Sequence, residues 1–255
     1  MLRPRLAGRF ALVLLSLVAL ATTACEPVNT NPPTTPGTKR IVLYGDSIPS
    51  WLVGTGSAGL DKTKYTVLNG AVSACDGDLP FRDARWVDNK VVPVTDWCKK
   101  GWRKHYPPFL ATRPDAVVIM GGTHAMLDHK MNGVWVNPCS ATGRKAYYDD
   151  IRSRLLYLRN YADDVFVVLP AWPGPQSRWI MPADYTARAD CVREELERAA
   201  TVRHAHIIDF GAYLCPVSKT SCNADRGTNG IHVDADKAST TLAWLLATVD
   251  AQISA

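Results

Sequence analysis

Two kinds of hydrophobic pattern alternate along the chain after its first 38 residues. Short runs that are mostly apolar or β-branched are typical of buried strands, and they cover Arg40–Tyr44, Tyr65–Leu68, Ala116–Met120, Val165–Leu169 and His206–Ile208. Longer stretches with a helical period lie near Trp97–Ala111, Gly143–Tyr161, Asp184–Thr201 and Ala235–Asp250. This alternation predicts an α/β fold, a three-layer α/β/α sandwich in which helices cover both faces of a mainly five-stranded parallel sheet.

Three stretches between these elements show neither an apolar run nor a helical period. They are rich in Gly, Pro and Trp, and we expect them to be long loops: Cys75–Val94, Gly121–Thr142 and Pro170–Ala183. Loops of this length inside a compact domain are often functional. The chain has no internal repeat.

The first 24 residues have the three parts of an export signal. Three arginines come first, an apolar run follows from Phe10 to Ala21, and small residues lead up to Cys25. The apolar run has about 12 residues, whereas a helix that spans a bilayer needs about 20. We therefore expect residues 1–24 to be a signal peptide that is removed on export.

Cys25 marks the start of the mature protein in this interpretation. The string Thr22-Thr23-Ala24-Cys25 resembles a bacterial lipobox, although Thr22 stands where an aliphatic residue is usual. A lipid on Cys25 would leave six of the seven cysteines, an even number for an oxidising compartment. We expect a lipoprotein anchored to the outer face of the cell membrane; the alternative is simple secretion with Cys25 unpaired.

Residues 25–38 are mainly Pro, Thr and Asn, a composition that cannot bury enough apolar surface to fold. We expect a disordered tether there, followed by one domain over residues 39–255. The net charge of +5 falls to +2 once the three signal arginines are removed, and nothing resembles the basic stripe that nucleic acid binding requires. We expect a monomer without a nucleic acid partner.

Candidate chemistry follows the strand ends. Ser47 comes just after the first predicted strand, Gly70 after the second, and Gly122 and His124 after the third, while His232 precedes the last helix. Ligands bind at the carboxyl ends of parallel strands, so these residues should converge on one edge of the sheet. A nucleophile, a base and backbone donors for an oxyanion are the parts that acyl transfer needs.

These residues lie in three short motifs with a familiar order. The motifs resemble three sequence blocks of SGNH/GDSL hydrolases. The serine block is Tyr44-Gly45-Asp46-Ser47, the glycine block is Asn69-Gly70-Ala71, and the histidine block is Gly230-Ile231-His232. The resemblance covers nearly the whole mature domain and implies a flavodoxin-like SGNH fold without a cofactor. It also implies that Ser47 is the nucleophile, that His232 is its base, and that the Ser47 and Gly70 N–H groups hold the oxyanion.

A closer resemblance is to the SGNH domains that accompany membrane acyltransferases of bacterial cell-surface glycans. The matching features are Cys75, Asp96-Trp97-Cys98 with Trp102, Pro114-Asp115-Ala116-Val117-Val118, and Asp209 with Leu214-Cys215-Pro216. The resemblance implies a serine esterase or O-acyltransferase that acts on acetyl or other short acyl esters of carbohydrate. It also suggests that Cys75 pairs with Cys98; Cys215 and Cys222 are close enough for a local bridge, which leaves Cys139 with Cys191, although sequence leaves other connectivities open.

Two positions depart from the family pattern. His124 stands where the family has an Asn that donates to the oxyanion; an imidazole can donate too, but His124 could equally contact substrate or be an inert loop residue. Asn229 stands where the histidine block has Asp, and we expect its amide to accept from His232 Nδ1–H and fix the tautomer. Asp225 is a possible replacement. The alternative function is a catalytically degenerate glycan-binding module.

Several other residues are candidates for substrate contact or for structure. Asp46, Gly122 and Trp172 are the substrate-binding candidates, although a carboxylate at Asp46 is more readily structural, and Ser47 could also cap the next helix. Trp51, Trp135, Trp172 and Trp179 lie in predicted loops, where each could face a sugar ring or simply pack. The only histidine clusters, Asp128-His129 and His204-Ala205-His206, supply too few ligands for zinc, so we expect no metal.

Overall fold

The computed structural model describes residues 37–73, 75, 82–87, 90–99, 101–174, 177, 181–219, 222 and 229–253. All of these residues belong to one compact unit, 31–255. The expected signal segment, Cys25 and nearly all of the tether lie outside the described residues, as do Trp179 and Asp225.

The main sheet confirms the five predicted strands. They are β1 (Lys39–Gly45), β2 (Tyr65–Asn69), β5 (Ala116–Met120), β8 (Asp164–Leu169) and β9 (His206–Asp209), all parallel in the order β2-β1-β5-β8-β9. The central strands are buried on both faces, which explains why they read as continuous apolar runs rather than as alternating ones.

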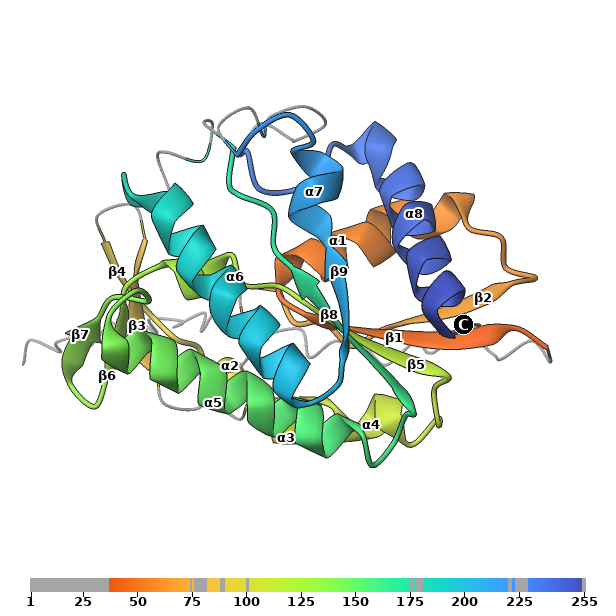
Figure 1. The fold of residues 1–255 in the computed structure, drawn as a ribbon, viewed down its shortest axis with the longest axis horizontal. Coiled ribbons are helices and arrows are strands. Elements are labelled where there is room, and N and C mark those ends of the chain that lie inside the picture. Colours follow the sequence, from red (N-terminus) through yellow and green to blue (C-terminus); the bar gives the residue numbers. More distant parts are fainter. Residues whose placement is uncertain are drawn as a thin grey trace, which may run out of the picture. The chain divides into compact units, whose positions relative to one another are not determined.

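Helices cover the two faces of this sheet (Figure 1). Helix α1 (Ser47–Gly56) packs against α8 (Ala235–Ile253) on one side, and α5 (Ala141–Leu158) packs against α6 (Tyr185–Val202) on the other. The predicted helices near Gly143–Tyr161, Asp184–Thr201 and Ala235–Asp250 are confirmed. A short helix, α7 (Phe210–Leu214), follows β9 directly and was not predicted.

The helix predicted near Trp97–Ala111 is wrong as a single element. The segment forms three one-turn helices, α2 (Asp96–Lys99), α3 (Trp102–His105) and α4 (Pro107–Leu110). Gly101 adopts a left-handed φ of 71° and Pro107 lacks an N–H, so the chain cannot continue as one helix. The segment is nevertheless anchored, because the Trp102 indole N–H donates to the buried Asp150 of α5 (3.1 Å).

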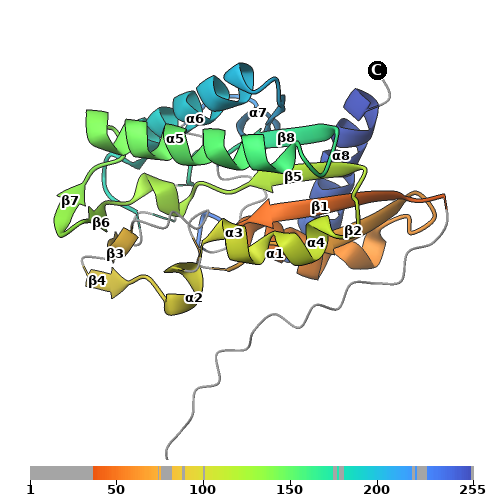
Figure 2. The same cartoon turned by 90° about the horizontal axis from the view of Figure 1, so that it is seen from below.

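A second sheet occupies two of the predicted loops and corrects that expectation. Strands β3 (Arg82–Val87), β4 (Lys90–Pro93), β6 (His129–Met131) and β7 (Val134–Val136) pair antiparallel in the order β4-β3-β6-β7. Figure 2 shows it at one end of the main sheet. The strands of this sheet contain charged residues among the apolar ones, as in β3 (RDARWV) and β6 (HKM), so they do not form the mostly apolar runs by which the main strands were recognised.

Three disulfides connect the loops to the main body. Cys75 pairs with Cys98, Cys139 with Cys191, and Cys215 with Cys222, which confirms the expected pairings. The Cys139–Cys191 bridge ties the segment before α5 to α6. Such bridges are consistent with an oxidising compartment outside the cytosol.

Candidate active site

Ser47 begins helix α1 at the carboxyl edge of the main sheet. The preceding Gly45 has a φ of 146°, and a Cβ there would lie 1.4 Å from the Met120 carbonyl oxygen, so only glycine fits. Asp46 caps the helix by accepting from the Ile48 N–H at 2.9 Å. Ser47 is therefore the first residue of the helix rather than its cap, and its side chain stays available for chemistry.

His232 meets Ser47 from the other end of the chain. Its Nε2 lies 2.8 Å from Ser47 Oγ, a hydrogen-bond distance suited to proton transfer. Two bonds hold the histidine loop in place: the Gly174 N–H donates to the Gly230 carbonyl (2.7 Å), and the Trp51 indole donates to the Val233 carbonyl (2.9 Å). Ser47 and His232, the predicted nucleophile and base, therefore lie within hydrogen-bond distance of each other.

Asn229 reaches the other ring nitrogen, but with its amide nitrogen rather than its oxygen. Asn229 Nδ2 lies 2.9 Å from His232 Nδ1. Its Oδ1 accepts instead from the backbone N–H groups of Ile231 (2.9 Å) and His232 (3.1 Å). The expectation that the amide oxygen accepts from Nδ1–H is therefore wrong in this arrangement, because that oxygen is bound to the backbone of the turn.

Gly70 is not arranged as an oxyanion donor. Its N–H donates to the Leu43 carbonyl at 2.9 Å and so continues the pairing of β2 with β1. A Cβ at Gly70 would meet the Tyr44 ring at 2.4 Å, so the glycine permits close packing of the two strands. The residue of this segment that lines the cleft beside Ser47 is Ser73, which our sequence analysis missed. Ser73 comes shortly after the end of β2, at the same sheet edge as Ser47, and this position could have identified it from the sequence.

The segment after β5 is fixed to Ser47 through Asp46. The Asp46 side chain is wholly buried, and burial raises its pKa to about 6 although hydrogen bonds from the Ile48, Thr123 and Gly122 backbone oppose the shift. A carboxylate that is wholly buried and caps α1 through the Ile48 N–H (2.9 Å) has a structural position. Gly122 is also buried, with a φ of 105°.

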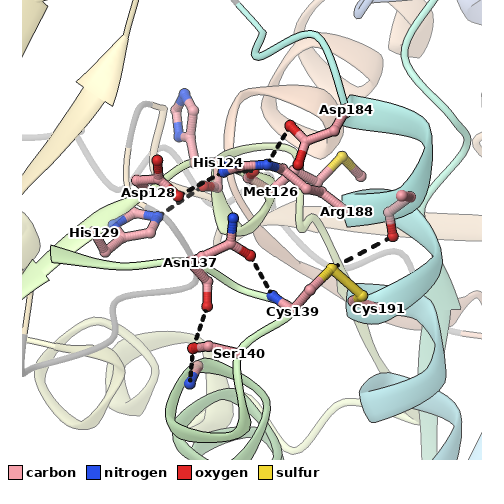
Figure 3. A network of polar contacts seen from close by, with 12 residues as sticks. His124, Met126, Asp128, His129, Asn137, Cys139, Ser140, Asp184, Arg188 and Cys191 are labelled. Atoms are coloured by element: carbon pink, nitrogen blue, oxygen red, sulfur yellow. Dashed lines mark hydrogen bonds and ion pairs between the residues drawn. A yellow bond between two sulfur atoms is a disulfide. The ribbon is translucent and has the colours of Figure 1, made fainter.

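His124 stays a candidate oxyanion donor. It begins a single 3₁₀ turn, His124–Met126, and burial lowers its pKa to about 4, so the ring is neutral at neutral pH. A neutral imidazole still has one N–H to donate. Figure 3 shows its ring pointing away from the polar network that holds the backbone of the same loop.

That network holds the backbone of the His124 loop through several polar contacts (Figure 3). Arg188 of α6 donates to Asp128 and Asp184, both at 2.7 Å, and to the Met126 carbonyl at 3.3 Å. The His129 ring contacts the His124 carbonyl oxygen at 2.8 Å. These bonds connect the backbone of the loop to α6 through Arg188 and to β6 through His129.

The cleft around Ser47 runs along the exposed face of α1. It has a volume of about 480 Å³ and is lined by Ser47, Ser50, Trp51, Gly54, Thr55, Ser73, Asn229, His232, Val233, Asp234 and Ala235. Trp51 is 39% exposed and its ring lies 5.9 Å from the His232 ring, centroid to centroid. Hydroxyl groups and one aromatic face beside a nucleophile are suited to a polar ring such as a sugar.

Trp172 does not line this cleft. It is buried, its indole donates to Asp190 (2.8 Å), and the Arg193 guanidinium covers its ring at 4.1 Å. Its position corresponds to packing rather than to the expected substrate contact. Within the described part of the chain, no group of three metal-ligating side chains comes together.

Comparisons with known proteins agree on family and fold. The family model described as "SGNH domain (fused to AT3 domains)" matches residues 19–248. A lipase/acylhydrolase from Enterococcus faecalis is similar in structure, with a TM-score of 0.57 and 14% identity over 84% of this chain and 97% of that one. No curated protein matches.

Two further solved structures share the fold. An acetylxylan esterase from Geobacillus stearothermophilus has a TM-score of 0.54 and 14% identity, covering 85% of this chain and 96% of that one. A GDSL-like lipase from Bacteroides thetaiotaomicron has a TM-score of 0.53 and 16% identity, covering 84% and 89%. The predicted α/β/α sandwich of the SGNH type is confirmed.

Proposed function

Because the chain belongs to the family of SGNH domains found fused to AT3 domains, a family of serine ester hydrolases and acyltransferases, we propose that it cleaves or transfers short O-acyl esters of carbohydrate. The acyl group that we expect is acetyl, and the expected location is outside the cytoplasm. The observation that carries the proposal is the 2.8 Å contact between Ser47 Oγ and His232 Nε2 at the end of an open cleft.

The reaction would proceed through an acyl-enzyme. Ser47 Oγ attacks the ester carbonyl while His232 Nε2 takes the hydroxyl proton, and the imidazolium then gives that proton to the leaving sugar oxygen. The developing oxyanion lies at the N-terminus of α1, where the Ser47 N–H and the helix dipole favour negative charge, with His124 as a further donor. Water or a second sugar hydroxyl resolves the acyl-enzyme, which gives hydrolysis or transfer.

Support for a carbohydrate ester comes from the cleft and from the relatives. Trp51 offers an aromatic face beside the reacting pair, and Ser50, Thr55 and Asp234 offer hydrogen-bond partners for ring hydroxyls. One similar structure is that of an acetylxylan esterase. The fusion partner in the family description, AT3, fits the transfer of an acyl group.

Export is supported by the leader-like first 24 residues and by the three disulfides. None of the helices among the described residues is both long and apolar enough to cross a bilayer. A lipid on Cys25 would then hold the domain at the outer face of the membrane.

A glycan-binding module without turnover is the second candidate function. The observation that favours it is the contact of Asn229 Nδ2, a hydrogen-bond donor, with His232 Nδ1. A site that keeps the cleft but lacks an active base would still bind an acylated sugar.

The test is the hydrolysis of 4-nitrophenyl acetate by the purified domain. We expect Ser47→Ala to lower kcat/KM at least about 100-fold, because the nucleophile is lost. Ser50→Ala is the matched control, since Ser50 lies on the same helix and lines the same cleft, and it should keep most of the activity. Equal rates for wild type and Ser47→Ala would reject the enzyme in favour of the binding module.

A further inference from the structure

The hydrogen bonds around Asn229 decide where the His232 proton lies. We propose that Asn229 is a positioning residue that holds neutral His232 with its proton on Nε2, and that this tautomer limits turnover at Ser47. The first part depends on three hydrogen bonds of the histidine turn; the second part depends on the proposed function.

The orientation of the Asn229 amide follows from its surroundings. Its oxygen accepts from the Ile231 and His232 backbone N–H groups, at 2.9 and 3.1 Å. The oxygen and nitrogen of an amide are assigned from such partners. A half-turn of the amide would point its NH₂ group at two N–H donors and lose both bonds. The amide nitrogen therefore faces His232 Nδ1, at 2.9 Å.

This orientation fixes the tautomer of the imidazole. An amide NH₂ can only donate, so Nδ1 must accept and carries no proton. A neutral imidazole has one proton, which is then on Nε2. Across the 2.8 Å contact, Nε2–H donates to Ser47 Oγ, and the hydroxyl keeps its own proton with no lone pair of Nε2 to receive it.

Turnover needs the opposite arrangement. Before Ser47 can attack, the Nε2 proton must leave to solvent and another proton must reach Nδ1, so that the ring stays neutral and Nε2 gains a lone pair. Nδ1–H would then face the Asn229 NH₂ group, donor against donor. The imidazolium that forms when Ser47 loses its proton has the same conflict, because both ring nitrogens are then protonated.

A carboxylate at position 229 would remove the conflict without changing the shape of the side chain. One oxygen would keep the bonds to the Ile231 and His232 N–H groups, and the other would accept from Nδ1–H. In a serine protease the reverse change, Asp to Asn, lowers kcat by about 10⁴ because the tautomer is wrong. We expect Asn229→Asp to raise kcat for 4-nitrophenyl acetate at least about 100-fold, with little change in KM.

The direct readout is the ¹⁵N NMR spectrum of histidine-labelled protein at neutral pH, with His232→Gln used to identify the His232 signals. We expect a bare Nδ1 and a protonated Nε2 in the wild type, and the reverse in Asn229→Asp. Asn69→Asp is the charge control, because Asn69 ends β2 at the same sheet edge and its oxygen accepts from the Ala71 N–H (3.2 Å) in a similar turn. It should leave both the tautomer and kcat unchanged.

The outcomes separate this inference from the proposed function. A protonated Nδ1 in wild-type His232 overturns the assignment, whatever the rates. If the tautomer differs between the wild type and Asn229→Asp but both proteins hydrolyse the ester equally fast, the tautomer does not limit turnover. If the tautomer differs and neither protein hydrolyses the ester, the tautomer assignment is supported and the proposed function is rejected. We also expect the double variant Ser47→Ala/Asn229→Asp to lose the gain in rate. If the gain remains, Ser47 is not the nucleophile in the faster reaction.

Discussion

Asp46 links the nucleophile to the loop that follows β5. Its buried carboxylate faces the N–H groups of Ile48, Gly122 and Thr123, and burial raises its pKa to about 6. The ionised form therefore costs folding free energy, and the backbone bonds offset only part of that cost.

A pH dependence of stability follows for Asp46. Its pKa rises from the ordinary value of 3.8 to about 6 in the folded chain because the carboxyl is buried. The folded state therefore holds the extra proton between these two values, and stability falls as pH rises through this window. We expect the unfolding free energy of the wild type, relative to Asp46→Asn, to fall by about 3 kcal/mol between pH 3.5 and pH 7. Urea unfolding at several pH values measures it.

The comparison with Asp46→Asn is necessary because His124 changes the stability with pH in the opposite direction. Burial lowers its pKa to about 4, so the folded state binds fewer protons than the unfolded chain below about pH 6.5, and stability is lost as pH falls. His124 is present in both proteins, so its contribution cancels in the difference. A difference that is flat with pH would contradict the assignment for Asp46.

Single residues were predictable where a motif named them, and unpredictable where a hydrogen bond decides their role. Ser47 and His232 were identified from short motifs, and the structure brings them to 2.8 Å. The direction of the Asn229 amide depends on two backbone donors of the turn, which no sequence pattern reveals. Gly70 was misassigned because its N–H still belongs to the pairing of β2 with β1.

Helix α1 divides its residues between the core and the cleft. Ile48, Leu52 and Gly56 are buried, whereas Ser47, Ser50, Trp51, Gly54 and Thr55 line the cleft. Residues three and four apart share one face of a helix, so this spacing makes a continuous strip that leads away from the nucleophile. The strip is where we expect the sugar chain to lie.

Gly54 allows the strip to be blocked without disturbing Ser47. A Cβ there would have no atom within 4 Å, so the space is open. We expect Gly54→Leu to lower kcat/KM for an acetylated xylo-oligosaccharide at least about tenfold, because the side chain fills the cleft, while 4-nitrophenyl acetate is cleaved as before.

Gly54→Ala is the matched control for this substitution. Alanine should stabilise the helix by about 0.5–1 kcal/mol and leave both substrates unaffected. Equal loss of activity on both substrates in Gly54→Leu would mean that the strip is not a carbohydrate subsite.

Elements were predictable where their sequence has a clear apolar pattern. The five strands of the main sheet are mostly apolar runs, and the helices α5, α6 and α8 are long enough for a helical period to be seen. The second sheet was missed because its strands mix charged and apolar residues, as in β3 (RDARWV) and β6 (HKM). The helix predicted around Trp102 fails because Gly101 and Pro107 interrupt it.

At the scale of the whole domain, parallel topology joins distant parts of the chain at one edge. Ser47 follows β1, the first strand, and His232 precedes α8, the last helix, while α1 packs directly against α8. Of the three disulfides, Cys75–Cys98 is the pairing that the resemblance to SGNH domains suggested. The acyl acceptor depends on the fit of a partner molecule, which the pattern of one chain does not encode.

The account depends most on Ser47 being acylated with the help of His232. Mixing the domain with 4-nitrophenyl acetate, quenching in acid and sequencing the peptides by mass spectrometry tests this directly. We expect one acetyl group on Ser47, strongly reduced in His232→Gln and enriched early in Asn229→Asp. An acetyl group on Ser50 or Ser73 instead, or the same labelling of Ser47 in His232→Gln, would contradict it.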